Sequence, residues 1–150
     1  MLGDNMKQNK DILDEVNKGA VMGMDAIKDI LPKVEDKVFK EVLDGEYEKY
    51  KTISKRIEEI YDDYAMKEDE PRETSPANKV MTKMMVDMKT IKDTSNSKLA
   101  ELLMQGTNMG IIEGRRLLNQ KDHIDEEVYE ILKDFVEMQE DSIETLKKYL

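Results

Sequence analysis

The sequence has no cysteine, no tryptophan and only one histidine, His123, among its 150 residues. Without cysteine there are no disulfides, no thiolate metal ligands and no cysteine nucleophile. One histidine leaves a single imidazole for acid–base or metal chemistry near neutral pH. The sequence also has no glycine-rich phosphate loop, nucleophile elbow or HExxH motif. We therefore assign no catalytic residue and no cofactor.

Long hydrophobic runs are also missing. No stretch approaches the 18 or so apolar residues of a membrane span, and the start, MLGDNMKQNK, has no apolar signal-peptide core. The 34 acidic residues outnumber the 24 basic ones, which gives a formal net charge of −10. Such a charge repels both a phosphate backbone and an anionic lipid surface. We therefore expect a cytoplasmic protein that binds neither nucleic acid nor membranes.

What the sequence does contain is helical periodicity, with apolar residues recurring at steps of three and four. This pattern, with 39% charged and only 5% aromatic residues, predicts one all-α domain. We expect helices at about 5–31, 37–66, 77–118 and 126–149, with an exposed linker, KEDEPRETSP, at 67–76. Four amphipathic helices favour a four-helix bundle made of two antiparallel helical hairpins. Fully extended, the linker is long enough for a crossover between parallel helices. Folded back, it also allows simple up-down order.

The third predicted helix is the longest. A single helix over residues 80–118 would reach about 60 Å, longer than the other helices could cover. Residues 93–97, DTSNS, carry side chains that compete for backbone hydrogen bonds. We therefore predict a bend or a break at 93–97.

Two glutamates, Glu46 and Glu113, interrupt helical stripes that are otherwise apolar. We interpret both as residues at the edge of the seam that reach water or pair with Lys49, Arg115 or Arg116. The alternative is that they bind a metal ion in an all-oxygen site or act as an acid–base pair.

Four methionines, Met81, Met84, Met85 and Met88, share one face of the third predicted helix. We interpret the face as core packing, because methionine is an adaptable core residue. A thioether site for a soft ion such as Cu(I) is one alternative. Another is an apolar interaction surface for a homodimer or a different protein partner.

Two smaller features lie in the second half of the chain. His123, flanked by Asp122 and Asp125, is interpreted as a solvated loop histidine, with a divalent-ion site as the alternative. Gly106 and Gly110 in QGTNMG form a small-xxx-small step, which predicts close packing against another helix.

Three phrases, MGMDAIKDILPKVED, MTKMMVDMKTIKDTSNSKLAELLMQGTNMG and DFVEMQEDSIETLKKYL, resemble an uncharacterised bacterial ferritin-like four-helix-bundle family. The resemblance covers nearly the whole chain. It implies a ferritin-like fold, and it brings no activity with it.

The di-iron chemistry of the ferritin-like superfamily provides a test of this chain. It needs a glutamate from each of two helices and a Glu-x-x-His pair from each of the other two. Here the corresponding pairs read Glu46-x-x-Lys49 and Gln139-x-x-Ser142, so both histidines are replaced. On the first and third predicted helices, the corresponding inward positions are Gly23 and Gly106, which have no side chain to bind a metal. We expect that the di-iron centre has been lost.

Two hypotheses about function follow. The first is a non-enzymatic ferritin-like bundle that acts through self-association or another protein–protein interaction. The alternative is a cryptic metal- or small-ligand-binding bundle that uses Glu46, Glu113 and Gln139 in its interior.

Overall fold

The computed structural model describes residues 2–65, 79–120 and 122–150, with their side chains except those of residues 2–4 and 79–83. No strand occurs in these ranges, so the predicted all-α class is confirmed. Their helical elements are α1 (Leu2–Ile30), the 3-10 turn η1 (Leu31–Lys33), α2 (Lys37–Tyr61), α3 (Lys79–Thr90), α4 (Asn96–Asn119) and α5 (Glu126–Lys147).

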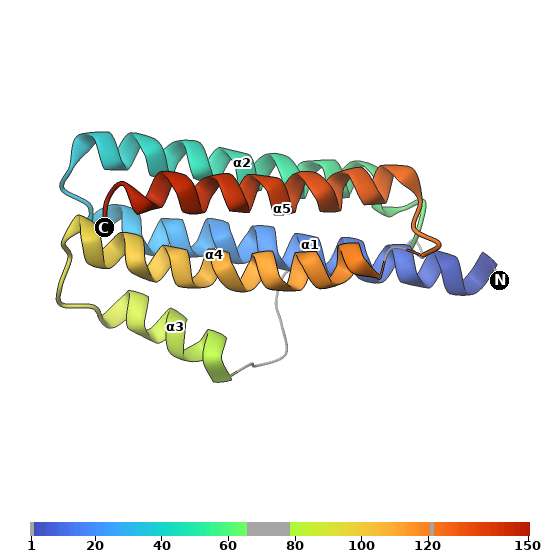
Figure 1. The fold of residues 1–150 in the computed structure, drawn as a ribbon, viewed down its shortest axis with the longest axis horizontal. Coiled ribbons are helices and arrows are strands. Elements are labelled where there is room, and N and C mark those ends of the chain that lie inside the picture. The colour runs from blue at the N-terminus through green and yellow to red at the C-terminus, as the bar shows by residue number, and fades with distance from the viewer. Residues whose placement is uncertain (1, 66–78, 121) are drawn as a thin grey trace.

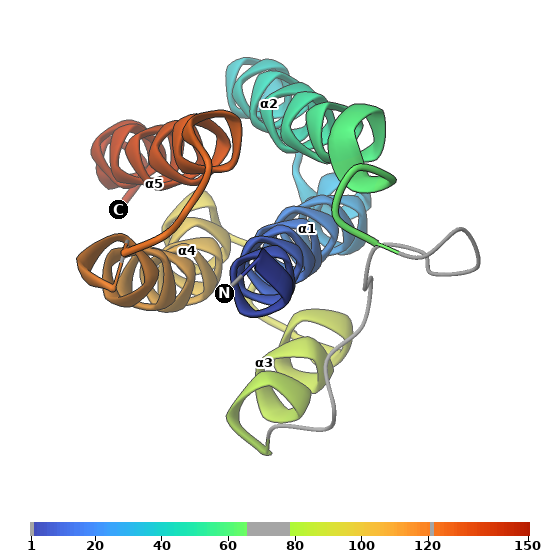
Figure 2. The same cartoon turned by 90° about the vertical axis from the view of Figure 1, so that its right-hand side faces the viewer.

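Four helices lie side by side and α3 packs on their outside (Figures 1 and 2). α1 and α2 form one antiparallel pair, and α4 and α5 form the other (Figure 1). Seen along the helices, α1 also neighbours α4, and α2 neighbours α5 (Figure 2). Since α2 and α4 point the same way, the chain must return along the molecule between them, and α3 runs in that returning direction (Figure 1).

The bend or break predicted at 93–97 is confirmed as a break, so the third predicted helix, 77–118, is two helices. α3 ends at Thr90, α4 begins at Asn96, and the chain reverses direction between them (Figure 1). Local side chains explain the break. The Asp93 carboxylate accepts from the backbone N–H of Ser95 at 3.0 Å, and the Ser95 hydroxyl accepts from the N–H of Lys98 at 3.3 Å, capping α4. The longest helix is α1, with 29 residues.

The other predicted boundaries hold to within a few residues. α1 starts at Leu2 and stops at Ile30, next to the turn that contains Pro32. The Asp36 side chain accepts from the N–H of Phe39 at 3.0 Å and caps α2. α2 ends at Tyr61, five residues before its predicted end at 66. The predicted linker at 67–76 lies outside the described residues.

The apolar stripe of α2 shows how the interior is built. The buried residues of this helix are Phe39, Leu43, Glu46, Tyr50, Ile53, Ser54, Ile57 and Tyr61. The predicted steps of four and three are therefore confirmed as far as Ile57. Within the described ranges, no helix combines the length and apolar character that crossing a bilayer requires.

Polar side chains also lie inside the molecule, between α1 and α2. Asp14 is only 1% exposed, and it accepts from the Tyr61 hydroxyl at 2.7 Å and from the Lys10 ammonium at 3.0 Å. One turn further along α1, Asn17 Oδ1 accepts from the Ser54 hydroxyl at 2.7 Å. Burial, together with the hydrogen bond to Asp14, raises the pKa of Tyr61 to about 12. Two of these bonds cross from α1 to α2 and fix how the two helices pair.

Candidate functional site

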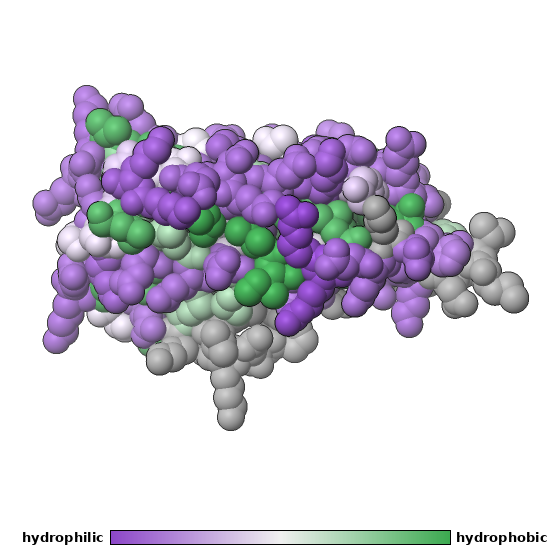
Figure 3. Space-filling view, in the orientation of Figure 1, coloured by the Kyte–Doolittle hydropathy of each residue, from purple (hydrophilic) through white to green (hydrophobic). Residues whose placement is uncertain are grey.

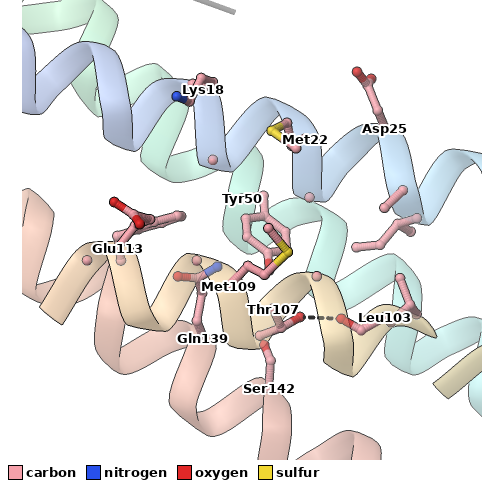
Figure 4. Close-up of a pocket in the computed structure, with 18 of the residues that line it drawn as sticks. Lys18, Met22, Asp25, Tyr50, Leu103, Thr107, Met109, Glu113, Gln139 and Ser142 are labelled. Atoms are coloured by element: carbon pink, nitrogen blue, oxygen red, sulfur yellow. Dashed lines mark hydrogen bonds between the residues drawn. The ribbon is translucent and has the colours of Figure 1, made fainter. Parts of the chain in front are cut away.

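A cavity of about 440 Å³ opens between α1, α3 and α4 and reaches inward to α2 and α5. Much of its wall is apolar, and three helices contribute methionines: Met22, Met84, Met85, Met88 and Met109. Figure 4 shows Met22 of α1 and Met109 of α4 reaching into the same space, with Tyr50 of α2 beside them. The thioether chains of methionine adapt to irregular shapes, so this wall suits an apolar group without demanding one shape.

Glycines in α1 and α4 let side chains from the opposite helices reach the inner end of the cavity. A Cβ at Gly23 would lie 2.6 Å from Cζ of Tyr50, and a Cβ at Gly110 would lie 2.2 Å from Nε2 of Gln139. Both side chains therefore rest directly on helix backbone. The close packing predicted for Gly110 is confirmed against α5, whereas Gly106 faces Met84 of α3 at 3.5 Å.

The inner end of the cavity carries a buried carboxylate. Glu46 is 5% exposed and lines the cavity. One of its oxygens accepts a short hydrogen bond from the Ser142 hydroxyl of α5. The other lies 3.5 Å from Nζ of Lys49, which is about half-exposed. Glu46 therefore has one good neutral donor and one distant cation, which is a weak set of partners for a buried negative charge.

A second polar group lies beside it, centred on Tyr50. The Tyr50 hydroxyl is within hydrogen-bonding reach of the side chains of Gln139 and Thr107. Burial is the main cause that raises the pKa of Tyr50, and contact with these two side chains lowers it. The Thr107 hydroxyl donates to the backbone oxygen of Leu103 at 2.8 Å (Figure 4).

One acceptor in this polar group has no hydrogen-bond donor. Oε1 of Gln139 is fully buried and has no hydrogen-bond partner among the described residues. Gln139 itself is only 3% exposed and lines the cavity. A buried acceptor without a donor costs about 1–3 kcal/mol. This amide oxygen therefore marks a place where a donor from outside the chain would be stabilising.

The charged residues that line the cavity are mostly acidic. Among the described residues they are Glu15, Lys18, Asp25, Asp29, Glu46 and Glu113, five acids and one base. The base is already paired, since Nζ of Lys18 lies 2.7 Å from the Glu15 carboxylate. The lining therefore favours a cation over an anion.

The structure brings together some of the residues predicted from the sequence and separates others. Glu46 and Gln139 both line the cavity, and Ser142, which donates to Glu46, lies three residues after Gln139 on α5. The Glu113 side chain is 64% exposed at the rim of the cavity and accepts from Arg116 at 2.7 Å. In the described parts of the chain, no three acidic or histidine side chains gather closely enough to hold a metal ion.

The methionine face of α3 turns mainly toward its own chain. Met88 is 3% exposed and Met84 is half-buried, and both line the cavity. Met85 is 41% exposed, and the side chain of Met81 lies outside the described residues. His123 is exposed in the connection before α5, with a positive φ of 70°.

Sequence reasoning missed the polar groups that α1 buries. Asp14 and Asn17 lie one position beyond the apolar residues Leu13 and Val16. They are buried because α1 contacts α2, α4, α5 and α3, so more of its circumference is covered than that of a helix with two neighbours. The sequence did contain a signal for this burial, because Asp14 and Asn17 are polar residues at i and i+3 directly beside an apolar stripe.

Replacing Glu46 by leucine is expected to raise the free energy of unfolding by about 1 kcal/mol. The Lys49 side chain can return to water, and the Ser142 hydroxyl can donate to a carbonyl of its own helix. Leucine then adds apolar burial at a position that is 5% exposed. Urea-induced unfolding followed by circular dichroism measures the change. A loss of stability would show that the carboxylate holds α2 and α5 together.

Comparisons with known proteins leave the site to be judged from its own geometry. No protein-family model matches the chain, and neither a curated protein nor a solved structure matches it.

Proposed function

We propose that this protein is a ferritin-like four-helix bundle that has lost its di-iron centre and binds a small, largely apolar molecule in the cavity. The ferritin-like assignment is supported by the helix order. Two antiparallel pairs are joined by a long connection between α2 and α4, which point the same way (Figure 1). Such a bundle has one long crossover.

The loss of the di-iron centre is supported by what the relevant side chains do. Ser142, at one of the expected histidine positions, donates its hydrogen bond to Glu46. Lys49, at the other, places a cation 3.5 Å from the same carboxylate. Gln139 is neutral and rests on the backbone at Gly110. A metal ion would meet a hydroxyl, an ammonium and an amide where it needs imidazole and carboxylate ligands.

The observation that carries the binding proposal is the buried, unpartnered Oε1 of Gln139 at the inner end of an apolar cavity. A volume of about 440 Å³ falls within the range of about 300–1,000 Å³ that is usual for small-molecule sites. Such sites combine an apolar wall with a few convergent polar groups, which here are Glu46, Tyr50 and Gln139.

Binding of 1-octanol to the purified protein tests the proposal. We expect a saturable signal in isothermal titration calorimetry with a negative heat-capacity change, because apolar surface leaves water. At a ligand concentration of about 100 times Kd, the melting temperature should rise by roughly 5–10 °C. No saturable binding of 1-octanol or of its chain-length homologues would contradict the proposal.

Two glycine-to-leucine variants control this experiment. Gly106 lines the cavity, and a Cβ there meets only Met84, at the ordinary contact distance of 3.5 Å. Leucine at this position must place its remaining atoms in the cavity, so Gly106→Leu is expected to weaken octanol binding at least tenfold. Gly45 is exposed and has nothing within 4 Å of its Cβ position, so Gly45→Leu is expected to bind as the unmodified protein does.

Self-association is a second candidate function. Met85, Val86 and Ile112 are 41%, 51% and 46% exposed on α3 and α4. On the face drawn in Figure 3, hydrophobic side chains form a band bordered by hydrophilic ones. Analytical ultracentrifugation should show a dimer at high concentration that Val86→Lys dissociates. A monomer at all concentrations would remove this candidate.

A further inference from the structure

Building on the proposed function, we infer that the ligand of the cavity is a primary alkylammonium ion. Its alkyl chain lies among the methionines, and its ammonium group lies between the Glu46 carboxylate and Oε1 of Gln139. Three features of the cavity lead to this ligand class: its charge, the spacing of its acceptors and its apolar wall.

The charge of the lining selects the sign of the head group. Five acidic residues and one lysine line the cavity among the described residues, and the lysine is paired with Glu15. Glu46 is the acid that matters most, since it is 5% exposed and its cation, Lys49, stands 3.5 Å away. Folding has already removed Glu46 from most of its water. A bound cation therefore gains the attraction without desolvating the carboxylate again.

The acceptors select the kind of cation. Ser142 donates to Glu46 and lies three residues after Gln139 on α5. Three residues correspond to a rise of about 4.5 Å along α5, so the carboxylate bound to Ser142 and the Gln139 amide lie at adjacent turns of that helix. One nitrogen that donates to both, at about 2.8 Å from each, spans that separation. A primary ammonium has three N–H donors, whereas a quaternary ammonium has none.

The apolar wall selects the rest of the molecule. Met22, Met84, Met88 and Met109 surround the space outward from Tyr50, and their side chains come from three helices. Flexible thioether chains can close around a linear chain of variable length. The rim carries the exposed Glu113 and Asp25 and the half-buried Asp29, and these acids also disfavour an anionic tail.

Four ligands with linear alkyl chains of nearly equal length and different head groups test the inference on the unmodified protein: octylamine, 1-octanol, octanoate and octyltrimethylammonium. Octylamine is protonated at neutral pH, as a lysine side chain is. We expect it to bind at least tenfold more tightly than 1-octanol and octyltrimethylammonium, and octanoate to bind most weakly. In Glu46→Gln, the ratio of the octylamine affinity to the 1-octanol affinity is expected to fall to about 1.

The variant Gly106→Leu separates the site from the surface. The net charge of −10 attracts any cation, and Gly106→Leu keeps that charge while its side chain takes up part of the cavity. Octylamine binding should therefore weaken at least tenfold in this variant. Octylamine that binds Gly106→Leu as tightly as it binds the unmodified protein would locate the ligand on the surface and overturn the inference.

The remaining outcomes are distinguishable. Octylamine that binds no more tightly than 1-octanol, or an octanoate that binds best, overturns the inference and leaves the proposed function standing. Failure of all four ligands overturns both. If circular dichroism shows that Glu46→Gln does not fold, the inference is tested by comparing the affinities of octylamine and octyltrimethylammonium for the unmodified protein. Equal affinities overturn the inference.

Discussion

Replacing Gly114 of α4 by leucine is expected to lower the free energy of unfolding by about 3 kcal/mol. Gly114 is buried, and a Cβ there would lie 2.4 Å from Cγ2 of Val136 on α5. Val136 cannot swing aside, because its methyl groups branch at the β carbon and restrict χ1. The gain in helix propensity, about 1 kcal/mol, is too small to offset the overpacking. Urea-induced unfolding followed by circular dichroism measures the loss.

The same substitution at two other glycines provides the comparison. A Cβ at Gly45 has nothing within 4 Å, and a Cβ at Gly106 meets only Met84 at 3.5 Å. Both leucine variants are expected to stay within about 1 kcal/mol of the unmodified protein. If Gly114→Leu were as stable as Gly45→Leu, α4 and α5 would not pack as closely as Gly114 and Val136 indicate.

Helix boundaries set by local chemistry could be predicted from the sequence. Pro32 ends α1 within a turn, and Asp36 caps α2 through the N–H of Phe39. The stripe of α2 from Phe39 to Ile57 is buried as its period predicts. Each of these features depends on residues within a few positions of one another, so the sequence contains the whole cause.

The reversal between α3 and α4 could not be predicted in the same way. The polar residues at 93–97 indicated an interruption, and Asp93 and Ser95 do form the hydrogen bonds that end the helical pattern. Whether a helix bends or turns back depends on which distant surfaces it can bury. α3 packs on α4 and on α1, and its contacts with α1 join residues far apart in the chain.

The candidate site was predicted in part for a related reason. Glu113 was interpreted as a residue at the edge of the seam, and this is confirmed, because its side chain is 64% exposed and accepts from Arg116. The same interpretation is wrong for Glu46, which is 5% exposed although Lys49 lies near it. On α4, the buried residue beside Glu113 is Gly114. A shift of one residue turns a helix by about 100°, which is enough to move Glu113 to the rim.

Replacing Asp14 by alanine is expected to have the largest effect of any single change in the polar interior, a loss of about 4 kcal/mol in the free energy of unfolding. Asp14 is 1% exposed and accepts from the Tyr61 hydroxyl at 2.7 Å and from Lys10 at 3.0 Å. Alanine removes both acceptor oxygens, so the buried Tyr61 hydroxyl no longer has a charged hydrogen-bond acceptor. Asp11→Ala, the same change at an exposed position of α1, is the control and should cost less than about 0.5 kcal/mol.

The pH dependence of that loss distinguishes the hydrogen bond from simple loss of packing. The pKa of Tyr61 is raised to about 12 in the folded protein, whereas an unfolded tyrosine titrates near 10. The folded state therefore holds this proton more tightly, and its contribution to stability is lost as the pH rises from about 10 to about 12. Burial still raises the pKa of Tyr61 in the variant, but without the Asp14 carboxylate the raised pKa values of both Tyr61 and Lys10 fall, so the variant should lose less over this interval. The stability difference between the two proteins is expected to narrow above pH 10 in urea titrations at stepped pH, and a constant difference would mean that Asp14 acts through packing alone.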